Sequence, residues 1–292
     1  MKTKGIVLIA IGTPEYLKMA YNLAVSIKSV EDLPITLVYN NNLVKDYLSA
    51  DKAKVFDNLV ECPSEFYTRK SGGNSFVKAK VHLYGLSPYD CTLFLDSDTA
   101  WNPYKKPSDL FDELAGINIT FKNTGYYSVT EGKGYDNENY TYWFDIPEML
   151  KAYKIKAENV YQIQSELFYF ERSKAVKRFF DDAIRVYEKP KVVSKLLFGK
   201  QNITDEMAFS ISLALNDLKP HQINWLPTFW NFLSKDRIDA NPSLFTEKYY
   251  ALSIGGMYTP QYIMTFYNNI IKKAFNKKGG IPFTIKPKTK QN

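Results

Sequence analysis

Two aspartates, two positions apart, follow a short apolar run. The run spans residues 91–95, and Asp96, Ser97 and Asp98 come directly after it. A short apolar run of this kind predicts a buried parallel strand. Carboxylates just past the carboxyl end of such a strand can share a hard divalent cation, because Mg²⁺ and Mn²⁺ prefer oxygen ligands. A cation held there can bind a diphosphate and neutralise its charge as it leaves.

The residues around the motif decide whether it is a metal site or an ordinary cap or turn. Acidic residues also cap helices and fill turns, which is the structural explanation of most such triplets. Here the segment Lys80–Asp90 precedes the strand, Thr99 follows the motif, and 107–111 read PSDLF. This arrangement resembles glycosyltransferase family 8, the glycogenin-like retaining enzymes. In that family a helix that begins near a donor-binding lysine leads to a strand and an Asp-x-Asp-Thr sequence.

The resemblance implies a fold, a donor and a metal. The fold is α/β, the Rossmann-like glycosyltransferase A fold, with a mostly parallel central sheet and helices on both faces. The donor is a nucleotide sugar, UDP-glucose or UDP-galactose, used with Mn²⁺ or Mg²⁺. The resemblance places Asp96 and Asp98 on the metal, and Lys80 and Ser97 on the donor.

The order of expected elements agrees with that fold. Apolar strand patterns alternate with segments that have a helical apolar period, and this alternation predicts a largely parallel sheet. The expected strands are 5–11, 35–39 and 54–60, and the expected helices are 14–29, 43–50 and 76–86.

The loop after the first strand is a candidate nucleotide site. Ile11, Gly12 and Thr13 end that strand, and small residues let the backbone approach a base or ribose closely. The resemblance implies that this loop binds the nucleotide, with Tyr16 stacked on the base. The alternative is an ordinary tight turn with Tyr16 packed on the following helix.

Two later segments resemble the sugar-side residues of the family. Gln164 can hydrogen-bond sugar hydroxyls, whereas Glu166 stands where the family has glycine. By resemblance Asp205 lies under the donor sugar, and Glu206 replaces a sugar-binding glutamine. A helix N-cap at Thr204 or Asp205 would explain the same residues structurally.

The clearest departure from the family pattern lies near residue 255. Ser253 aligns with a histidine that is the third metal ligand, and Thr259 aligns with a lysine that grips the diphosphate. A serine hydroxyl is a poor cation ligand, so weak metal binding is expected. Gly255 and Gly256 can still offer backbone N–H groups to phosphate.

Residues 122–150 are polar, rich in turn residues and rich in tyrosine. Such a segment is typical of a loop whose aromatic side chains stack on an acceptor sugar or base. The alternative is a surface insertion packed by its own aromatic residues.

Length and composition favour one catalytic domain followed by a helix and a tail. The chain has 292 residues, of which 45% are hydrophobic. We predict a single domain over 1–260, with a nucleotide-binding half of about 1–110 and a sugar and acceptor half of about 111–260. An amphipathic helix over 261–275 and a basic tail over 276–292 follow.

Few residues suggest other chemistry or a membrane span. Two cysteines do not make a disulfide framework, and two histidines are too few for a histidine-based zinc site. The apolar N-terminal run is too short for a span and is interpreted as the first strand, not a signal peptide. A cytoplasmic protein, peripheral at a membrane at most, is expected.

The basic character belongs to the C-terminal residues. The seven lysines of 272–292 match the formal net charge of +7, so the rest of the chain is formally neutral. An apolar stripe with lysines can lie on an anionic membrane, and a polycationic tail can touch nucleic acid. The same stripe can equally dock on the domain.

The sequence therefore predicts a metal-dependent retaining glycosyltransferase that moves a hexose to an acceptor hydroxyl. A glycan, glycolipid or lipopolysaccharide is the expected acceptor, and a hydroxymethylated DNA base is an alternative. A non-catalytic sugar-nucleotide or glycan-binding relative is the second alternative, suggested by Ser253, Thr259 and Glu166. The oligomeric state does not follow from the sequence.

Overall fold

The computed structural model of the protein divides into two compact units, each built from more than one stretch of sequence. Unit 1 comprises Met1–Pro63, Thr92–Ala115 and Trp225–Asn292, and unit 2 comprises Ser64–Cys91 and Gly116–Asn224. The residues that the structure describes are 2–40, 43–68, 75–136, 144–194, 203–221, 249–256 and 260–286.

Unit 1 is built on a sheet in the order β3-β2-β1-β4. The β1–β2 and β2–β3 pairs are both parallel, with Ile6 opposite Ile35 and Thr36 opposite Asn58. The inner strands are short and almost wholly buried, as parallel strands covered by helices must be. The strands are β1 (Lys4–Ala10), β2 (Ile35–Tyr39), β3 (Asn58–Glu61) and β4 (Cys91–Asp96).

The strand–helix alternation predicted from the sequence is present in unit 1. The strand expected at 54–60 begins only at Asn58, because the turn that ends a short helix takes up the preceding residues. Ser49 starts that helix by accepting a hydrogen bond from the Lys52 backbone N–H at 3.4 Å. The helices are α1 (Pro14–Lys28), α2 (Leu43–Tyr47), α3 (Ala50–Ala53), α6 (Pro107–Glu113) and α12 (Gln261–Lys278).

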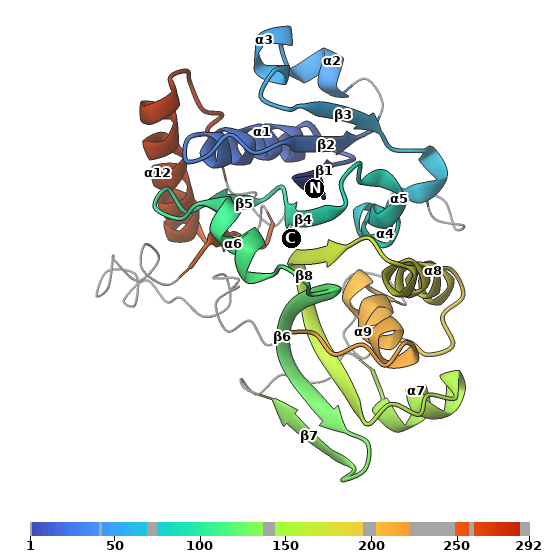
Figure 1. Ribbon diagram of the computed structural model, residues 1–292. Helices are drawn as coiled ribbons and strands as arrows, with labels where there is room; N and C mark the ends of the chain where they lie inside the picture. Colours follow the sequence, from blue (N-terminus) through green and yellow to red (C-terminus); the bar gives the residue numbers. More distant parts are fainter. Residues whose placement is uncertain are drawn as a thin grey trace. The chain divides into compact units, whose positions relative to one another are not determined.

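Helices α1 and α12 pack against each other (Figure 1). The rings of Tyr21 and Phe275 lie 5.8 Å apart between their centroids. The residues that α12 buries are Ile263, Met264, Tyr267, Ile270, Ile271, Ala274 and Phe275. The apolar stripe predicted for this helix is therefore covered within unit 1.

A two-stranded antiparallel ribbon lies beyond the aspartate motif in unit 1. It pairs β5 (Thr99–Trp101) with β9 (Ala251–Ser253), and Thr99 lies opposite Ser253. The Trp101 backbone N–H donates to Ser26 Oγ of α1 at 3.1 Å. The ribbon thus carries residues from the C-terminal part of the chain to the end of β4.

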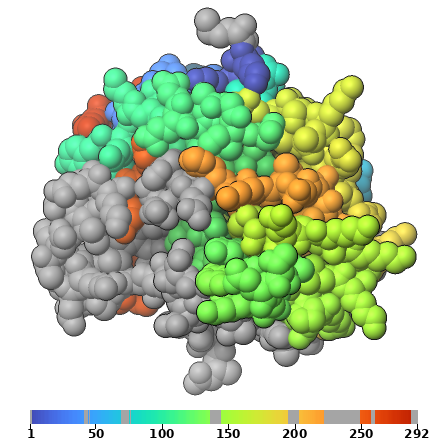
Figure 2. Space-filling view, turned by 60° about the horizontal axis from the view of Figure 1, so that its bottom comes forward, coloured from blue at the N-terminus to red at the C-terminus, as the bar shows by residue number. Residues whose placement is uncertain are grey.

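Unit 2 is an antiparallel sheet in the order β8-β6-β7, with helix α9 on β8 and helix α8 packed against α9. Its core is aromatic, and Phe121, Phe168 and Phe209 pack with ring centroids 4.8 to 5.6 Å apart. Figure 2 shows part of the orange segment 203–221, which contains α9, at the surface. The elements are the 3₁₀ turn Ser64–Phe66, α4 (Phe76–Val81), α5 (Leu83–Leu86), β6 (Ile119–Ser128), β7 (Lys133–Asp136), α7 (Ile146–Tyr153), β8 (Asn159–Glu171), α8 (Lys174–Glu188) and α9 (Asp205–Leu215).

The prediction that residues 122–150 form a loop is wrong for most of the residues in this range that the structure describes. Strands β6 and β7 form a hairpin there, and α7 follows. Tyr126 lies opposite Tyr135, with the two rings stacked at 5.1 Å. Tyrosines favour cross-strand pairs, so they indicate strand here more than loop. Residues 137–143 lie outside the described residues, and the acceptor role of the segment stays a prediction.

The predicted helix over 76–86 is divided at His82. The backbone of His82 has φ −96° and ψ 3°, so α4 ends and α5 begins at this residue. The apolar period continues through the break, which is why the sequence pattern predicts one helix. Lys80 lies in the last turn of α4.

Within the described ranges, no helix combines the length and apolar character that a membrane crossing needs.

Candidate active site

The aspartate motif lies at the end of β4, as predicted. Its middle residue, Ser97, links this end of β4 to β1 by a hydrogen bond. The Ser97 hydroxyl donates a hydrogen bond to the backbone carbonyl of Ile9, and Ser97 is buried. Asp96 is partly exposed, whereas Asp98 is buried. Ser97 therefore has a positioning role, and donor binding by its hydroxyl stays a prediction.

Asp98 is held by the turn that follows β9. Its carboxylate Oδ2 accepts a hydrogen bond from the Gly256 backbone N–H at 2.5 Å. Its backbone carbonyl accepts another from the Ile254 N–H at 3.0 Å. The Gly256 N–H therefore fixes one oxygen of the Asp98 carboxylate through a charge-assisted hydrogen bond. The structure thus brings Asp98 together with Ser253, Gly255 and Gly256.

Both glycines of the turn have positive φ angles, 64° at Gly255 and 92° at Gly256. Side chains other than glycine rarely adopt this conformation. The Gly255 N–H donates to Ser253 Oγ at 3.2 Å, and Ser253 is buried. The serine oxygen therefore already accepts one hydrogen bond, which leaves it a weaker metal ligand than the sequence alone suggests.

The donor set at this turn fits a hard divalent cation. Asp96, Asp98 and Ser253 offer only oxygen atoms, which Mg²⁺ and Mn²⁺ prefer. Across the described part of the chain, no group of three or more His, Cys, Asp or Glu side chains is placed to hold a metal. Mg²⁺ commonly binds through one or two carboxylates together with substrate phosphates, so a two-carboxylate site suits a metal bound together with its donor.

The loop after β1 contains a buried polar atom suited to a ligand. Gly12 has a φ of 96°, and its N–H donates to Asn40 Oδ1 at 2.8 Å. Among the described residues, no hydrogen-bond partner is found for the buried Thr13 Oγ1. Buried hydroxyls normally have a partner, so a bound molecule can supply it. Ile11 is buried and Tyr16 is partly exposed.

Asn40 belongs to this loop as well, although the sequence pattern does not single it out. It directly follows β2, as Ile11 and Gly12 follow β1, and its side chain fixes the Gly12 backbone. Its position after a buried parallel strand was the available signal. Two further asparagines follow it in the sequence, which hid its separate role.

Unit 2 contains a second group of predicted site residues. Lys80 Nζ lies 3.2 Å from Asp205 Oδ2, and both side chains are nearly inaccessible. Ser165 of β8 lies among them, with its Oγ 2.6 Å from Asp205 Oδ2, 3.3 Å from Glu206 Oε1 and 3.3 Å from Lys80 Nζ. We call Lys80, Ser165, Asp205 and Glu206 the carboxyl cluster. Ser165 was not predicted, although it stands between two predicted residues.

The N-cap alternative is resolved by Thr204. Its hydroxyl accepts a hydrogen bond from the Met207 N–H at 3.3 Å, so Thr204 is the N-cap of α9. Asp205 is therefore not needed for capping, and its carboxylate pairs with Lys80 instead. Capping alone does not account for the Asp205–Glu206 pair.

The two carboxyl groups of the cluster have opposite pKa shifts. Burial alone would raise the pKa of Asp205, but the charge of Lys80 and hydrogen bonds with Glu206 and Ser165 bring it below its usual value. Burial raises the pKa of Glu206 well above its usual value, and the adjacent Asp205 charge raises it further. Glu206 is partly exposed, so a molecule at the surface of unit 2 can reach it. Carboxyl groups with separated pKa values are typical of sites that use acid–base chemistry.

Gln164 and Glu166 flank Ser165 on β8. Gln164 is buried and lies opposite Lys122 of β6 in the strand ladder. Glu166 is partly exposed, and its negative charge contributes to the raised pKa of Glu206. The contribution of β8 to the carboxyl cluster is therefore Ser165, and the sugar-binding role of Gln164 stays a prediction.

Comparison with known proteins identifies the fold. The sequence matches no protein-family model and no curated protein. The galactosyltransferase LgtC, solved with donor and acceptor sugar analogues, has a TM-score of 0.52 over 95% of this chain and 97% of its own, at 12% identity. The chain has a glycosyltransferase fold. An active-site mutant of LgtC matches with a TM-score of 0.54 at 10% identity, again over 95% and 97%.

A second, larger glycosyltransferase supports the same assignment. The apo structure of the bifunctional glycosyltransferase WbbM has a TM-score of 0.54 at 13% identity over 94% of this chain. The match covers 52% of WbbM, so this chain spans about half of that protein. At such identities the likeness concerns the fold, and it confirms the predicted α/β glycosyltransferase architecture.

Proposed function

We propose that the protein is a metal-dependent retaining glycosyltransferase that moves a hexose from a nucleotide sugar to an acceptor hydroxyl. UDP-glucose and UDP-galactose are the proposed donors. The observation that carries this proposal is the Asp98 carboxylate, fixed by the Gly256 N–H at the end of β4 in a glycosyltransferase fold. Ligands of open α/β sheets bind at this edge of the strands.

The residues of unit 1 suit the nucleotide and its diphosphate. Asp96, Asp98 and Ser253 would hold the Mn²⁺ or Mg²⁺ ion. Such an ion, when bound, neutralises the negative charge of a departing diphosphate. The Thr13 hydroxyl, which lies close to the Gly12 turn, offers a hydrogen bond to the nucleotide.

The carboxyl cluster of unit 2 suits the sugar part of the donor. Glycosyl transfer passes through a state in which the sugar carries positive charge. The ionised Asp205 is fixed by Lys80 and Ser165, so it is a preorganised negative charge of the kind that stabilises such a state. We propose Asp205 and Lys80 as catalytic residues, with Gln164 and Glu206 in contact with the sugar.

A donor screen tests the proposal. The protein is incubated with UDP-glucose, UDP-galactose and other nucleotide sugars in the presence of Mn²⁺, and the free nucleotide is measured. We expect slow hydrolysis of at least one donor, and its loss when EDTA is added. Full activity in EDTA would contradict the metal dependence, and no hydrolysis or transfer with any donor would contradict the enzyme proposal.

The second candidate is a sugar-nucleotide binding protein without turnover. It is favoured by the hydrogen bond from Gly255 to Ser253, which engages the oxygen that would complete the metal site. Calorimetric titration with UDP and with each UDP-sugar distinguishes the two. Tight binding of a donor with no product over prolonged incubation would support this candidate.

The acceptor is proposed by chemical class. A glycan, glycolipid or lipopolysaccharide hydroxyl is proposed first, and a hydroxymethylated DNA base second. Once a donor is found, mass spectrometry of a tagged acceptor panel identifies the modified class by the added hexose. Retention is checked by the NMR coupling constant of the new bond, where an α-linked donor sugar should give an α-linked product.

A further inference from the structure

The carboxyl cluster contains more hydrogen-bond acceptors than its ionised form can satisfy. A serine hydroxyl has one proton to donate and lone pairs with which to accept. Ser165 Oγ is 2.6 Å from Asp205 Oδ2, which makes Asp205 the partner that receives this proton. The Lys80 ammonium donates to Ser165 Oγ at 3.3 Å. Ser165 therefore has no second proton for Glu206.

The remaining contact requires a proton on Glu206. Glu206 Oε1 lies 3.3 Å from Ser165 Oγ, and Glu206 also lies within hydrogen-bonding reach of Asp205. An ionised Glu206 would face two oxygen atoms without a hydrogen between them. A protonated Glu206 can donate to either one. One of these contacts becomes a hydrogen bond only when Glu206 carries the proton and is the neutral member of the pair.

The balance of charges leads to the same result. Two ionised carboxyls and one ammonium would leave a net negative charge in a site where Asp205 is 1% exposed. Adjacent carboxylates in such a site do not both ionise near neutral pH. One bound proton makes the group neutral, with Lys80 paired to Asp205 at 3.2 Å.

Other charged groups that face Glu206 do not reverse this balance. Glu166 of β8 adds negative charge and so favours the proton, whereas Lys80 of α4 opposes it. Asp182 of α8 is engaged at the opposite end of α9, where it accepts a hydrogen bond from Asn216 at 2.9 Å. Lys80 Nζ lies 3.2 Å from Asp205 Oδ2, so its charge favours the ionised form of Asp205.

We infer that Asp205 and Glu206 form a carboxyl pair that keeps one proton at neutral pH, with the proton on Glu206 and the negative charge on Asp205. The effect on catalysis rests on the proposed glycosyltransferase function, whereas the protonation does not. Glu206 then donates a hydrogen bond and fixes the orientation of the ionised Asp205. Loss of that proton would place two negative charges at the site and misalign Asp205.

Infrared spectroscopy tests the protonation without any substrate. The carbonyl stretch of a neutral carboxyl is separate from the bands of a carboxylate, so a pH titration from acid to alkaline shows which groups stay protonated. We expect one neutral carboxyl to persist above the usual range for glutamate, about pH 4.3. It should be absent from Glu206→Gln and present in Glu148→Gln, a matched change at an exposed glutamate of α7. A wild-type spectrum without this band at neutral pH would overturn the inference.

The pH dependence of transfer tests the consequence. For the wild type, kcat/KM should fall about tenfold per pH unit above the pKa of the pair, as expected for loss of one proton. Glu206→Gln keeps a donor at this position and cannot lose it by titration, so its residual activity should lack this alkaline fall. Circular dichroism checks that the variant is folded.

The two arms separate the two claims. A persistent neutral carboxyl with no turnover on any donor would remove the proposed function and leave the inference standing. Turnover with the same alkaline fall in the wild type and in Glu206→Gln would refute the role of Glu206 and leave the function standing.

Discussion

At the scale of single residues, Lys80 is the counter-charge of a buried carboxylate. Its removal in Lys80→Ala would leave Asp205 ionised and unpaired, which costs about 3–5 kcal/mol of folding free energy. Turnover should fall by roughly 10²-fold or more, since one electrostatic contact at the reacting centre is lost. Denaturant unfolding and initial rates measure the two effects.

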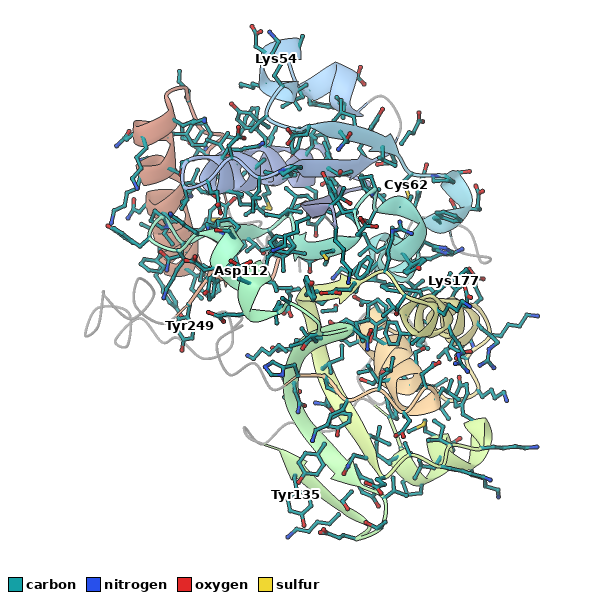
Figure 3. The ribbon with its side chains drawn as sticks, viewed as in Figure 1. Lys54, Cys62, Asp112, Tyr135, Lys177 and Tyr249 are labelled. Carbon is teal, nitrogen blue, oxygen red and sulfur yellow. The ribbon has the colours of Figure 1, made fainter. Side chains whose placement is uncertain are left out.

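Lys177→Ala is the matched control for Lys80→Ala. Lys177 of α8 is 60% exposed and pairs with Asp181 at the surface, and Figure 3 labels it. Exposed pairs contribute about 0–1 kcal/mol, so little change is expected. Equal effects of the two variants would show that Lys80 contributes no more to stability or turnover than an exposed lysine does.

Glu206 also predicts how stability depends on pH. Its pKa is raised in the folded state, so the folded protein binds more protons than the unfolded chain above the usual glutamate range. Its contribution to stability is complete below that range and is lost as pH rises toward the raised pKa. The slope is about 1.4 kcal/mol per pH unit for one proton.

Glu206→Gln should remove this decline, so its unfolding free energy should exceed that of the wild type increasingly as the pH is raised. Urea unfolding at several pH values measures the difference. Asp205 has a lowered pKa and contributes in the opposite direction, with stability lost as pH falls below the usual aspartate range. Parallel curves for the two proteins above the usual glutamate range would contradict the assignment.

At the scale of elements, the turn after β9 positions the metal motif. Gly256 has a φ of 92° and donates its N–H to Asp98. Gly256→Ala should therefore strain the backbone by about 1–3 kcal/mol and weaken Mn²⁺ binding in the presence of UDP. Gly85→Ala is the control, because a Cβ there meets nothing within 4 Å and no positive φ is involved. A Gly256→Ala protein with wild-type stability and Mn²⁺ affinity would show that the turn is dispensable.

The elements that the sequence predicted well are those with a strong local pattern. The strand before Asp96 and the helix after Gly12 follow directly from apolar period and from Pro14 at the first helical position. The hairpin within 122–150 was missed because turn residues obscured the pairing of Tyr126 with Tyr135. The pairing of Tyr126 with Tyr135 depends on the register of the hairpin, which composition does not reveal.

The same limit applies to the candidate site. Asp98 and Asp205 were predicted because their neighbours in the sequence resemble a family. Ser165 and Asn40 were missed, because their roles depend on Lys80 and Gly12, 85 and 28 residues away. Such contacts exist only once the strands are paired.

At the scale of the whole molecule, each unit unites distant parts of the chain. In unit 1, Asn22 of α1 both donates to the Phe283 carbonyl, at 2.7 Å, and accepts from its N–H, at 3.0 Å. Asn268 of α12 makes the same pair of contacts with Ile285, at 3.0 and 3.3 Å. The described part of the predicted tail thus binds the surface of its own unit.

Phe283→Ala should destabilise unit 1. Phe283 packs against Tyr21, with ring centroids 5.4 Å apart, and Lys52 Nζ lies 4.0 Å above its ring. Loss of this partly buried ring should cost about 1–3 kcal/mol. Ile281→Ala, at a side chain that is 80% exposed, should cost little. Thermal unfolding of both variants decides whether the segment 281–286 is part of the fold.

The role of the metal motif is tested most directly by one pair of aspartates. Asp98→Ala and Asp112→Ala each remove one aspartate carboxylate from unit 1. Asp112, labelled in Figure 3, is 74% exposed and pairs with Lys4 at the surface, where such pairs contribute little. The measurement is release of free UDP from a UDP-hexose in Mn²⁺ for both folded variants. We expect Asp98→Ala to lose roughly 10²-fold or more and Asp112→Ala to match the wild type. Wild-type rates in Asp98→Ala would contradict the account.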